Sequence, residues 1–170
     1  MRNQETGQIR LYVLGDARIE TSKGVIDPSS ELIFASALYL ILERRPAVSR
    51  RELQNILWPG VKQDSGSHRL RQLLFRLRQS GFDVSSKSGS RICLNGDLWI
   101  DVDEIISTSK EVFDHNSLGR PVLPAFDPTF SDPFSDWLDR RRGAITGDLA
   151  RVILGRIARA RVGGRWQQVE

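Results

Sequence analysis

The stretch SHRLRQLLFRLRQSG, residues 67–81, combines two patterns in one short segment. Leucines recur at the three- and four-residue spacing of a helix that buries one side. They are Leu70, Leu73, Leu74 and Leu77. Arginines occupy many of the positions between them, and no acidic residue occurs between Asp64 and Asp83. Since exposed helices usually mix acidic and basic residues that pair at i,i+4, the stretch predicts a helix with an unusually basic outer face.

At about 100° per residue, the leucines share one face, which we expect to pack against the preceding helices. The opposite face has a centre without arginine and two arginine edges. The centre holds His68, Gln72, Phe75 and Gln79, and the edges hold Arg69 and Arg76 on one side and Arg71 and Arg78 on the other. Such arginines can reach phosphates on both walls of a DNA major groove, while glutamine bonds adenine, arginine bonds guanine and an aromatic edge touches a thymine methyl. The helix alone does not decide between this function and an ordinary solvated face.

Short strands and a mostly apolar helix are predicted upstream. Residues 9–27 alternate apolar and polar side chains and contain the turn signals GDA and SKG, so they predict a small antiparallel sheet. Residues 28–46 predict a helix at the centre of the core, because their apolar side chains cover more than one face. We expect Ser29 or Ser30 to cap its start and Pro46 to close it.

A second helix with a clear start precedes the basic stretch. Ser49 and Glu52 have the spacing of the S-x-x-E capping box, in which each side chain bonds a free N–H at the helix start. The segment 61–67 is then predicted to be a polar loop, with Asp64 or Ser65 as the cap of the basic helix.

A hairpin and a helical tail are predicted after the basic helix, which ends at its glycine. Residues 82–95 predict a β-hairpin whose tip is SSKSGS. Residues 97–113 predict a short strand that runs into a helix, and residues 114–134, rich in proline and glycine, predict a connector. Residues 135–161 predict helix up to the sequence VGG. Because the last residues look like the start of another helix, we expect the chain to be part of a longer protein.

Charge is segregated along the chain. Residues 44–91 carry 11 basic and 3 acidic side chains, a net charge of +8, while residues 92–139 carry 2 basic and 10 acidic ones, a net charge of −8. A basic block that contains the arginine-edged helix favours a polyanionic partner, with nucleic acid as the first candidate.

Other features of the sequence limit the class of protein. The single cysteine, Cys93, excludes an internal disulfide framework and a multi-cysteine zinc site. No apolar run approaches the roughly 18 residues of a membrane span, and the first residues lack the apolar core of a signal peptide. The two histidines, His68 and His115, lie far apart, and no serine has a nucleophile motif. We therefore expect a cytoplasmic protein that is not an enzyme and binds no metal, cofactor or membrane.

The order of these elements predicts an α+β winged helix-turn-helix. The helix over 64–80 would read the major groove, and the wing over 82–95 would meet the flanking minor groove or backbone. The second helix would meet the backbone with its first turn. The candidate DNA-binding residues are His68, Arg69, Arg71, Gln72, Phe75 and Arg76 in the helix, Lys87 and Arg91 in the wing, and Arg50 and Arg51 at the start of the second helix.

Four segments resemble a known family. VSRRELQNILWPG, SHRLRQLLFRLRQSGFDV and LNGDLWIDVDEI together resemble the winged-helix domain of OmpR-like transcription factors, and more closely the bacterial antibiotic regulatory protein (SARP) type. DPFSDWLDRRRGAI resembles the entry to that family's tetratricopeptide-like activator domain. The resemblance covers roughly residues 9–170. It implies a DNA-binding domain over 1–103, followed over 104–170 by a connector and the first helices of a truncated activator domain.

The resemblance also implies a function. Members of the family bind double-stranded DNA and activate transcription by engaging RNA polymerase, and the second domain would mediate self-association or receive a signal. Phe75 departs from the family, which often has small or hydroxyl side chains there, so no base preference is carried over. The alternative is a protein-interaction module in which a winged helix docks an acidic partner with its basic helix.

Overall fold

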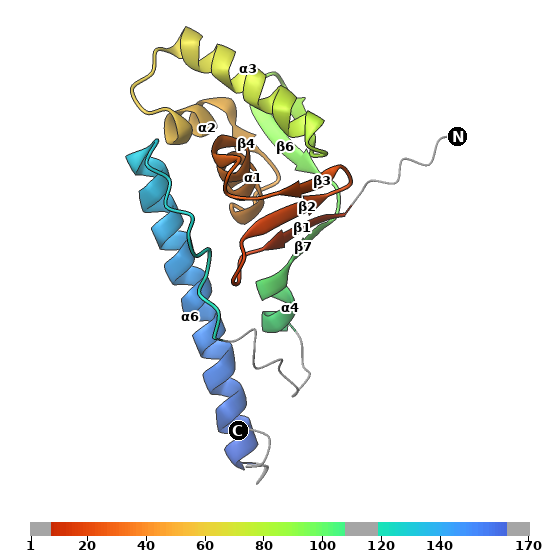
Figure 1. Cartoon of the computed structure of the whole chain (residues 1–170), viewed down its shortest axis with the longest axis vertical. Coiled ribbons are helices and arrows are strands. Elements are labelled where there is room, and N and C mark those ends of the chain that lie inside the picture. The colour runs from red at the N-terminus through yellow and green to blue at the C-terminus, as the bar shows by residue number, and fades with distance from the viewer. Residues whose placement is uncertain (1–7, 108–118, 163–170) are drawn as a thin grey trace, which may run out of the picture.

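The computed structural model describes residues 8–107 and 119–162, which form a mixed α+β fold (Figure 1). The helices and two small sheets pack around one hydrophobic core. The strands are β1 (Ile9–Tyr12), β2 (Arg18–Thr21), β3 (Gly24–Ile26), β4 (Val48–Ser49), β5 (Asp83–Lys87), β6 (Arg91–Asn95) and β7 (Leu98–Ile100). The helices are α1 (Glu31–Leu42), α2 (Arg50–Leu57), α3 (Gln63–Gln79), α4 (Asp101–Ser107) and α6 (Asp132–Val162).

The first sheet has the strand order β3-β2-β1-β7. The antiparallel pairing of β1 with β2 and of β2 with β3 is as predicted. A fourth strand from outside the predicted range, β7, pairs in parallel with β1. The Asp101 carboxylate, just beyond β7, accepts the backbone N–H groups of Val13 and Leu14 at 3.0–3.1 Å. It thereby holds the ends of β1 and β7 together.

The second sheet contains the predicted hairpin. β5 and β6 pair in an antiparallel ladder from Asp83 opposite Asn95 to Lys87 opposite Arg91, and the short β4 pairs with the other edge of β6. The tip is shorter than predicted, because the ladder includes residues 85–87 and leaves only 88–90 as the turn.

The helix starts differ from the capping predictions. Ser30 occupies the N-cap position of α1 without a side-chain hydrogen bond, while Ser29 instead bonds Asp27. In α2, Ser49 Oγ accepts the Glu52 N–H at 3.0 Å, as predicted. The Glu52 carboxylate, however, bonds Tyr39 on α1, so it does not complete the reciprocal half of the capping box.

α3 starts earlier than predicted. The predicted loop over 61–67 is confirmed only for residues 61–62, because the Gly66 N–H donates to the Lys62 carbonyl at 2.9 Å and the helix begins at Gln63. Asp64 and Ser65 therefore lie inside the first turn instead of capping it. Gly66 is buried beside Gln54 of α2, so packing between the two helices outweighs the weak helix propensity of glycine and serine.

α6 is a 31-residue helix that runs along one side of the molecule (Figure 1). It begins within the predicted connector, because the buried Ser131 accepts the Phe134 N–H and starts the helix before residue 135. Phe134, Trp137 and Leu138 belong to the same hydrophobic cluster as α1, α2 and α3. The predicted division at residues 103/104 stays a prediction, and His115 lies outside the described residues.

Candidate nucleic-acid interface

α3 presents the two faces that its sequence predicts. Its leucine face is buried against α1, α2 and β5. Leu70, Leu73, Leu74 and Leu77 are at most 4% exposed. On the outer face, the six candidate side chains of α3 are all exposed. α3 lies at one end of the molecule, and the C-terminal half of α6 reaches towards the other (Figure 1).

The arginines of this outer face have no acidic partner. Arg69, Arg71 and Arg76 form no ion pair or side-chain hydrogen bond with the other described residues. Six arginines outside α3 are paired with carboxylates. These pairs are Arg18–Glu20, Arg44–Asp103, Arg45–Glu52, Arg141–Glu43, Arg142–Asp139 and Arg151–Asp148. α3 therefore carries three exposed guanidinium groups without a carboxylate partner on one face. Arg10, Arg51 and Arg140 also form no ion pair with a described residue, but they lie on three separate elements, β1, α2 and α6.

Arg78, the fourth arginine of the basic stretch, has a different role. Its Nε donates to the Val84 carbonyl at 2.8 Å, so it joins α3 to β5. The turn between β2 and β3 holds the same end of α3, where Thr21 Oγ1 donates to the Ser80 carbonyl at 2.7 Å and Lys23 Nζ to the Arg78 carbonyl at 3.3 Å. The sequence contains no signal for the contacts of Thr21 and Lys23, because they join segments more than 50 residues apart.

The hairpin places two like charges opposite each other. Lys87 and Arg91 are a directly paired cross-strand couple beside the turn, and both are exposed. Like charges in this position destabilise an isolated sheet, and a bound anion would remove that cost. Neither residue forms an ion pair with another described residue.

Arg50 connects the hairpin to α2. Its backbone N–H donates to the Ser90 carbonyl at 2.8 Å, and its guanidinium donates to Ser86 Oγ at 3.3 Å. Arg78 and Arg50 thus hold the hairpin from α3 and from α2. The orientation of the hairpin relative to α3 is set by these contacts.

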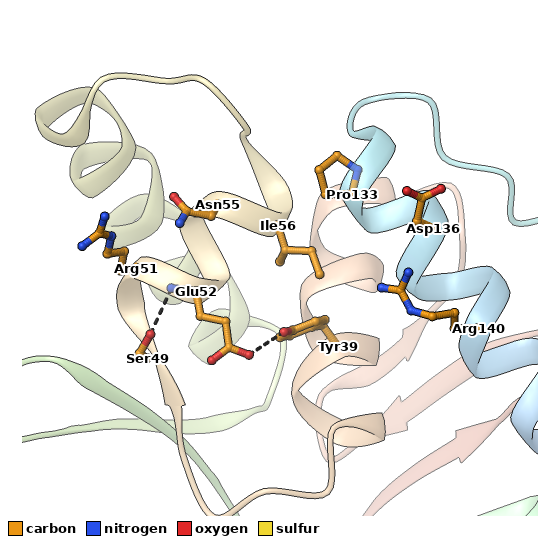
Figure 2. A pocket seen from close by; sticks show the side chains of 9 residues that line it. All are labelled: Tyr39, Ser49, Arg51, Glu52, Asn55, Ile56, Pro133, Asp136 and Arg140. Carbon is orange, nitrogen blue, oxygen red and sulfur yellow. Dashed lines mark hydrogen bonds between the residues drawn. The ribbon is translucent and has the colours of Figure 1, made fainter.

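Arg51 lies elsewhere, at an open pocket of about 670 Å³ between α1, α2 and α6. Figure 2 shows Arg51 on the α2 side of this pocket and Arg140 on the α6 side. Tyr39, Ile56 and Pro133 supply much of its apolar lining. Arg51 thus lines this pocket from the α2 side.

The central side chains of the α3 face are ordered in part by one another. Gln72 Nε2 and His68 Nε2 are 3.0 Å apart, a hydrogen bond between residues one turn apart. Phe75, one turn further along, is 59% exposed. The Gln72 side chain is thus held by His68, one turn closer to the start of α3, and the Phe75 ring faces solvent.

A network of polar side chains joins the end of α1 to α2 and α6. Glu43, at the end of α1, accepts from Trp137 Nε1 at 2.7 Å and from Arg141 at 2.6 Å, and also pairs with Arg45. Burial raises the pKa of the Glu43 carboxyl, but the hydrogen bonds from Arg141 and Trp137 and the nearby charges outweigh it and leave the pKa below its usual value. Arg45 also pairs with Glu52 of α2.

α2 is also joined to α6 at its other end. Ser131 Oγ donates to the Ile56 carbonyl at 2.6 Å, close to the last turn of α2. α2 is therefore held by α1 near its N-terminal end and by the start of α6 near its C-terminal end. These contacts fix the position of α2, against which α3 packs. Sequence reasoning did not find these contacts, because their members come from three separate segments.

Comparisons with known proteins add no identification: no protein-family model matches the chain, and no curated protein matches it. Among residues 8–107 and 119–162, no group of three or more histidine, cysteine or acidic side chains could hold a metal ion. Within the same ranges, no helix has the length and apolar character needed to cross a membrane.

Proposed function

We propose that this protein is a sequence-specific double-stranded DNA-binding transcription regulator with a winged helix-turn-helix. In this proposal α2 and α3 form the helix-turn-helix, α3 enters the major groove, and the β5–β6 hairpin is the wing. The contacts of Arg78 and Arg50 support it, since they hold the hairpin beside α3, where it can reach the flanking minor groove or backbone.

One observation carries the proposal. Arg69, Arg71 and Arg76 are exposed on one helix face without an acidic partner among the described residues, while six arginines on other parts of the chain pair with carboxylates. Unpaired guanidinium groups that converge on one face match a polyanion, because phosphates supply the missing counter-charges. Lys87 and Arg91 extend the same charge onto the hairpin.

The family resemblance extends the proposal beyond DNA binding. The four-stranded sheet, three helices and hairpin are compatible with an OmpR-like domain of the antibiotic regulatory type, and α6 stands where the activator domain would begin. We infer a cytoplasmic transcriptional activator, not an enzyme, that engages RNA polymerase and self-associates through its helical part. No cofactor takes part in this function.

The experiment is binding to a duplex selected by the protein from a random pool. Arg76→Ala is expected to weaken binding by about 1–3 kcal/mol if Arg76 contacts a base. Arg151→Ala is the matched control, because it removes an exposed arginine that lies on α6 and already pairs with Asp148. Circular dichroism verifies that both variants are folded.

Two results would contradict the proposal at different levels. Equal affinity of Arg76→Ala and the unchanged protein would refute the base-reading role of Arg76. Failure of the unchanged protein to retard any duplex at low salt would refute DNA binding itself. The second result would favour the alternative function, docking of an acidic protein partner on the same face.

A further inference from the structure

Phe75 is an exposed aromatic ring at the centre of a cationic surface. Four large apolar side chains are exposed among the described residues: Val25, Phe75, Leu98 and Leu154. Of these, Phe75 alone is aromatic, and it alone lies on α3. Keeping a phenylalanine ring in water forfeits the free energy of burying it, so the ring contributes little to the packing of the fold.

The neighbouring side chains leave the ring uncovered. The residues one turn before it, Arg71 and Gln72, are exposed, and Gln72 is bonded back towards His68. One turn after it, Arg78 is directed to the Val84 carbonyl. These contacts draw two long neighbours away from the ring, which stays 59% exposed.

We propose, on the basis of the DNA-binding function above, that Phe75 reads the C5-methyl group of a thymine in the major groove. The methyl group is the one apolar group on the major-groove edges of the four base pairs, and the other groups there are hydrogen-bond donors and acceptors. An aromatic ring cannot satisfy those groups, but it gains by covering a methyl. Phe75 therefore determines specificity at one base pair.

The charges around the ring favour DNA as its occupant over an apolar protein groove. An apolar groove that enclosed Phe75 would also desolvate Arg71 and Arg76 without giving them partners, which is costly. DNA places phosphates beside the same arginines while it offers the methyl to the ring. The occupant that fits both the ring and its surroundings is a thymine within a duplex.

The spacing along α3 places this thymine relative to a second contact. Gln72 and Phe75 lie three residues apart, which corresponds to about 4.5 Å along a helix axis. Neighbouring base pairs are separated by about 3.4 Å. Gln72, whose amide suits adenine, and Phe75 are therefore expected to face adjacent base pairs in the preferred site.

The test replaces single thymines in the selected duplex by uracil, which removes the methyl group and keeps the base pair. For the unchanged protein, one substitution is expected to weaken binding about 4-fold, the loss for one buried methyl-sized group. Phe75→Ala is expected to bind thymine and uracil duplexes equally, and Phe75→Leu to retain part of the difference. Leu154→Ala, which removes an exposed apolar side chain of α6, is the matched control and is expected to discriminate like the unchanged protein.

A second arm adds a methyl group instead of removing one. At the same position, a 5-methylcytosine·guanine pair is expected to bind the unchanged protein more tightly than a cytosine·guanine pair, and Phe75→Ala is expected to show no such gain. Duplex binding without thymine–uracil discrimination at any position would overturn the role of Phe75 while leaving the proposed function intact. Discrimination that persists in Phe75→Ala would also overturn it. Absence of duplex binding altogether would overturn both proposals.

Discussion

At the residue scale, two neighbours on α3 have opposite environments. Leu74 is 2% exposed within the core, whereas Phe75 is 59% exposed on the outer face. The spacing of leucines predicts this division, since it places the four leucines on one side and the aromatic ring opposite them. The sequence is sufficient here because the contrast depends only on helix geometry.

The same pair of residues gives a stability prediction. Leu74→Ala is expected to lower the free energy of unfolding by about 2–5 kcal/mol, because it leaves a cavity in a packed core. Phe75→Ala is expected to change it by less than about 0.5 kcal/mol, as is usual for surface positions. Urea unfolding followed by circular dichroism measures both. A loss of several kcal/mol in Phe75→Ala would show that the ring packs against the protein.

Other residue roles could not be predicted from the pattern. Arg78 and Arg71 lie on the same edge of the predicted helix, yet only Arg78 bonds the Val84 carbonyl. The difference depends on where β5 passes the end of α3, which is a property of the tertiary fold. The contacts of Thr21 and Lys23 could not be predicted either, because their partners are backbone carbonyls at the end of α3, which is distant in the sequence.

At the scale of elements, α2 connects the proposed reading helix to the rest of the molecule. Its N-terminal end is held by the Ser49 cap and by Glu52, which bonds Tyr39 of α1. Its C-terminal end is held by the bond from Ser131 to the Ile56 carbonyl. The cap could be predicted from the S-x-x-E pattern, but the destination of the Glu52 carboxylate could not, because it depends on α1 packing beside α2.

The ion pairs of Glu43 with Arg45 and Arg141 predict how the stability of the fold depends on pH. Because the pKa of Glu43 is lower in the folded chain than its ordinary value, the stability from its contacts is present above the ordinary glutamate range. It is lost as the pH falls from the ordinary glutamate range through the lower folded-state pKa. Glu43→Gln is therefore expected to be less stable than the unchanged protein at pH 7, and the difference is expected to shrink on acidification.

Urea unfolding at a series of pH values measures this difference. Asp148→Asn is the matched control, because it neutralises a carboxylate in an exposed pair with Arg151 on α6, and exposed pairs contribute little. A difference between Glu43→Gln and the unchanged protein that stays constant from pH 7 to pH 3 would contradict the assigned role of Glu43.

At the scale of the whole molecule, the basic and acidic blocks of the sequence form different elements of the fold. The block of residues 44–91, with a net charge of +8, contains α2, α3 and most of the hairpin. The acidic block of residues 92–139 contributes Asp103 as the partner of Arg44 and Asp139 as the partner of Arg142. The segregation could be predicted by counting charges. The parallel pairing of β7 with β1 could not, because it joins segments almost 90 residues apart with no local turn between them.

The salt dependence of duplex binding tests the central claim most directly. Each phosphate neutralised by a protein cation contributes about −0.9 to the slope of log K against log salt concentration. With Arg69, Arg71, Arg76, Lys87 and Arg91 free to contact phosphates or bases, we expect a slope of about −3 to −5. An alanine substitution of an arginine that contacts phosphate should make it shallower by about 1, while Arg151→Ala should leave it unchanged. A slope near zero, or no binding to any duplex at low salt, would contradict the account.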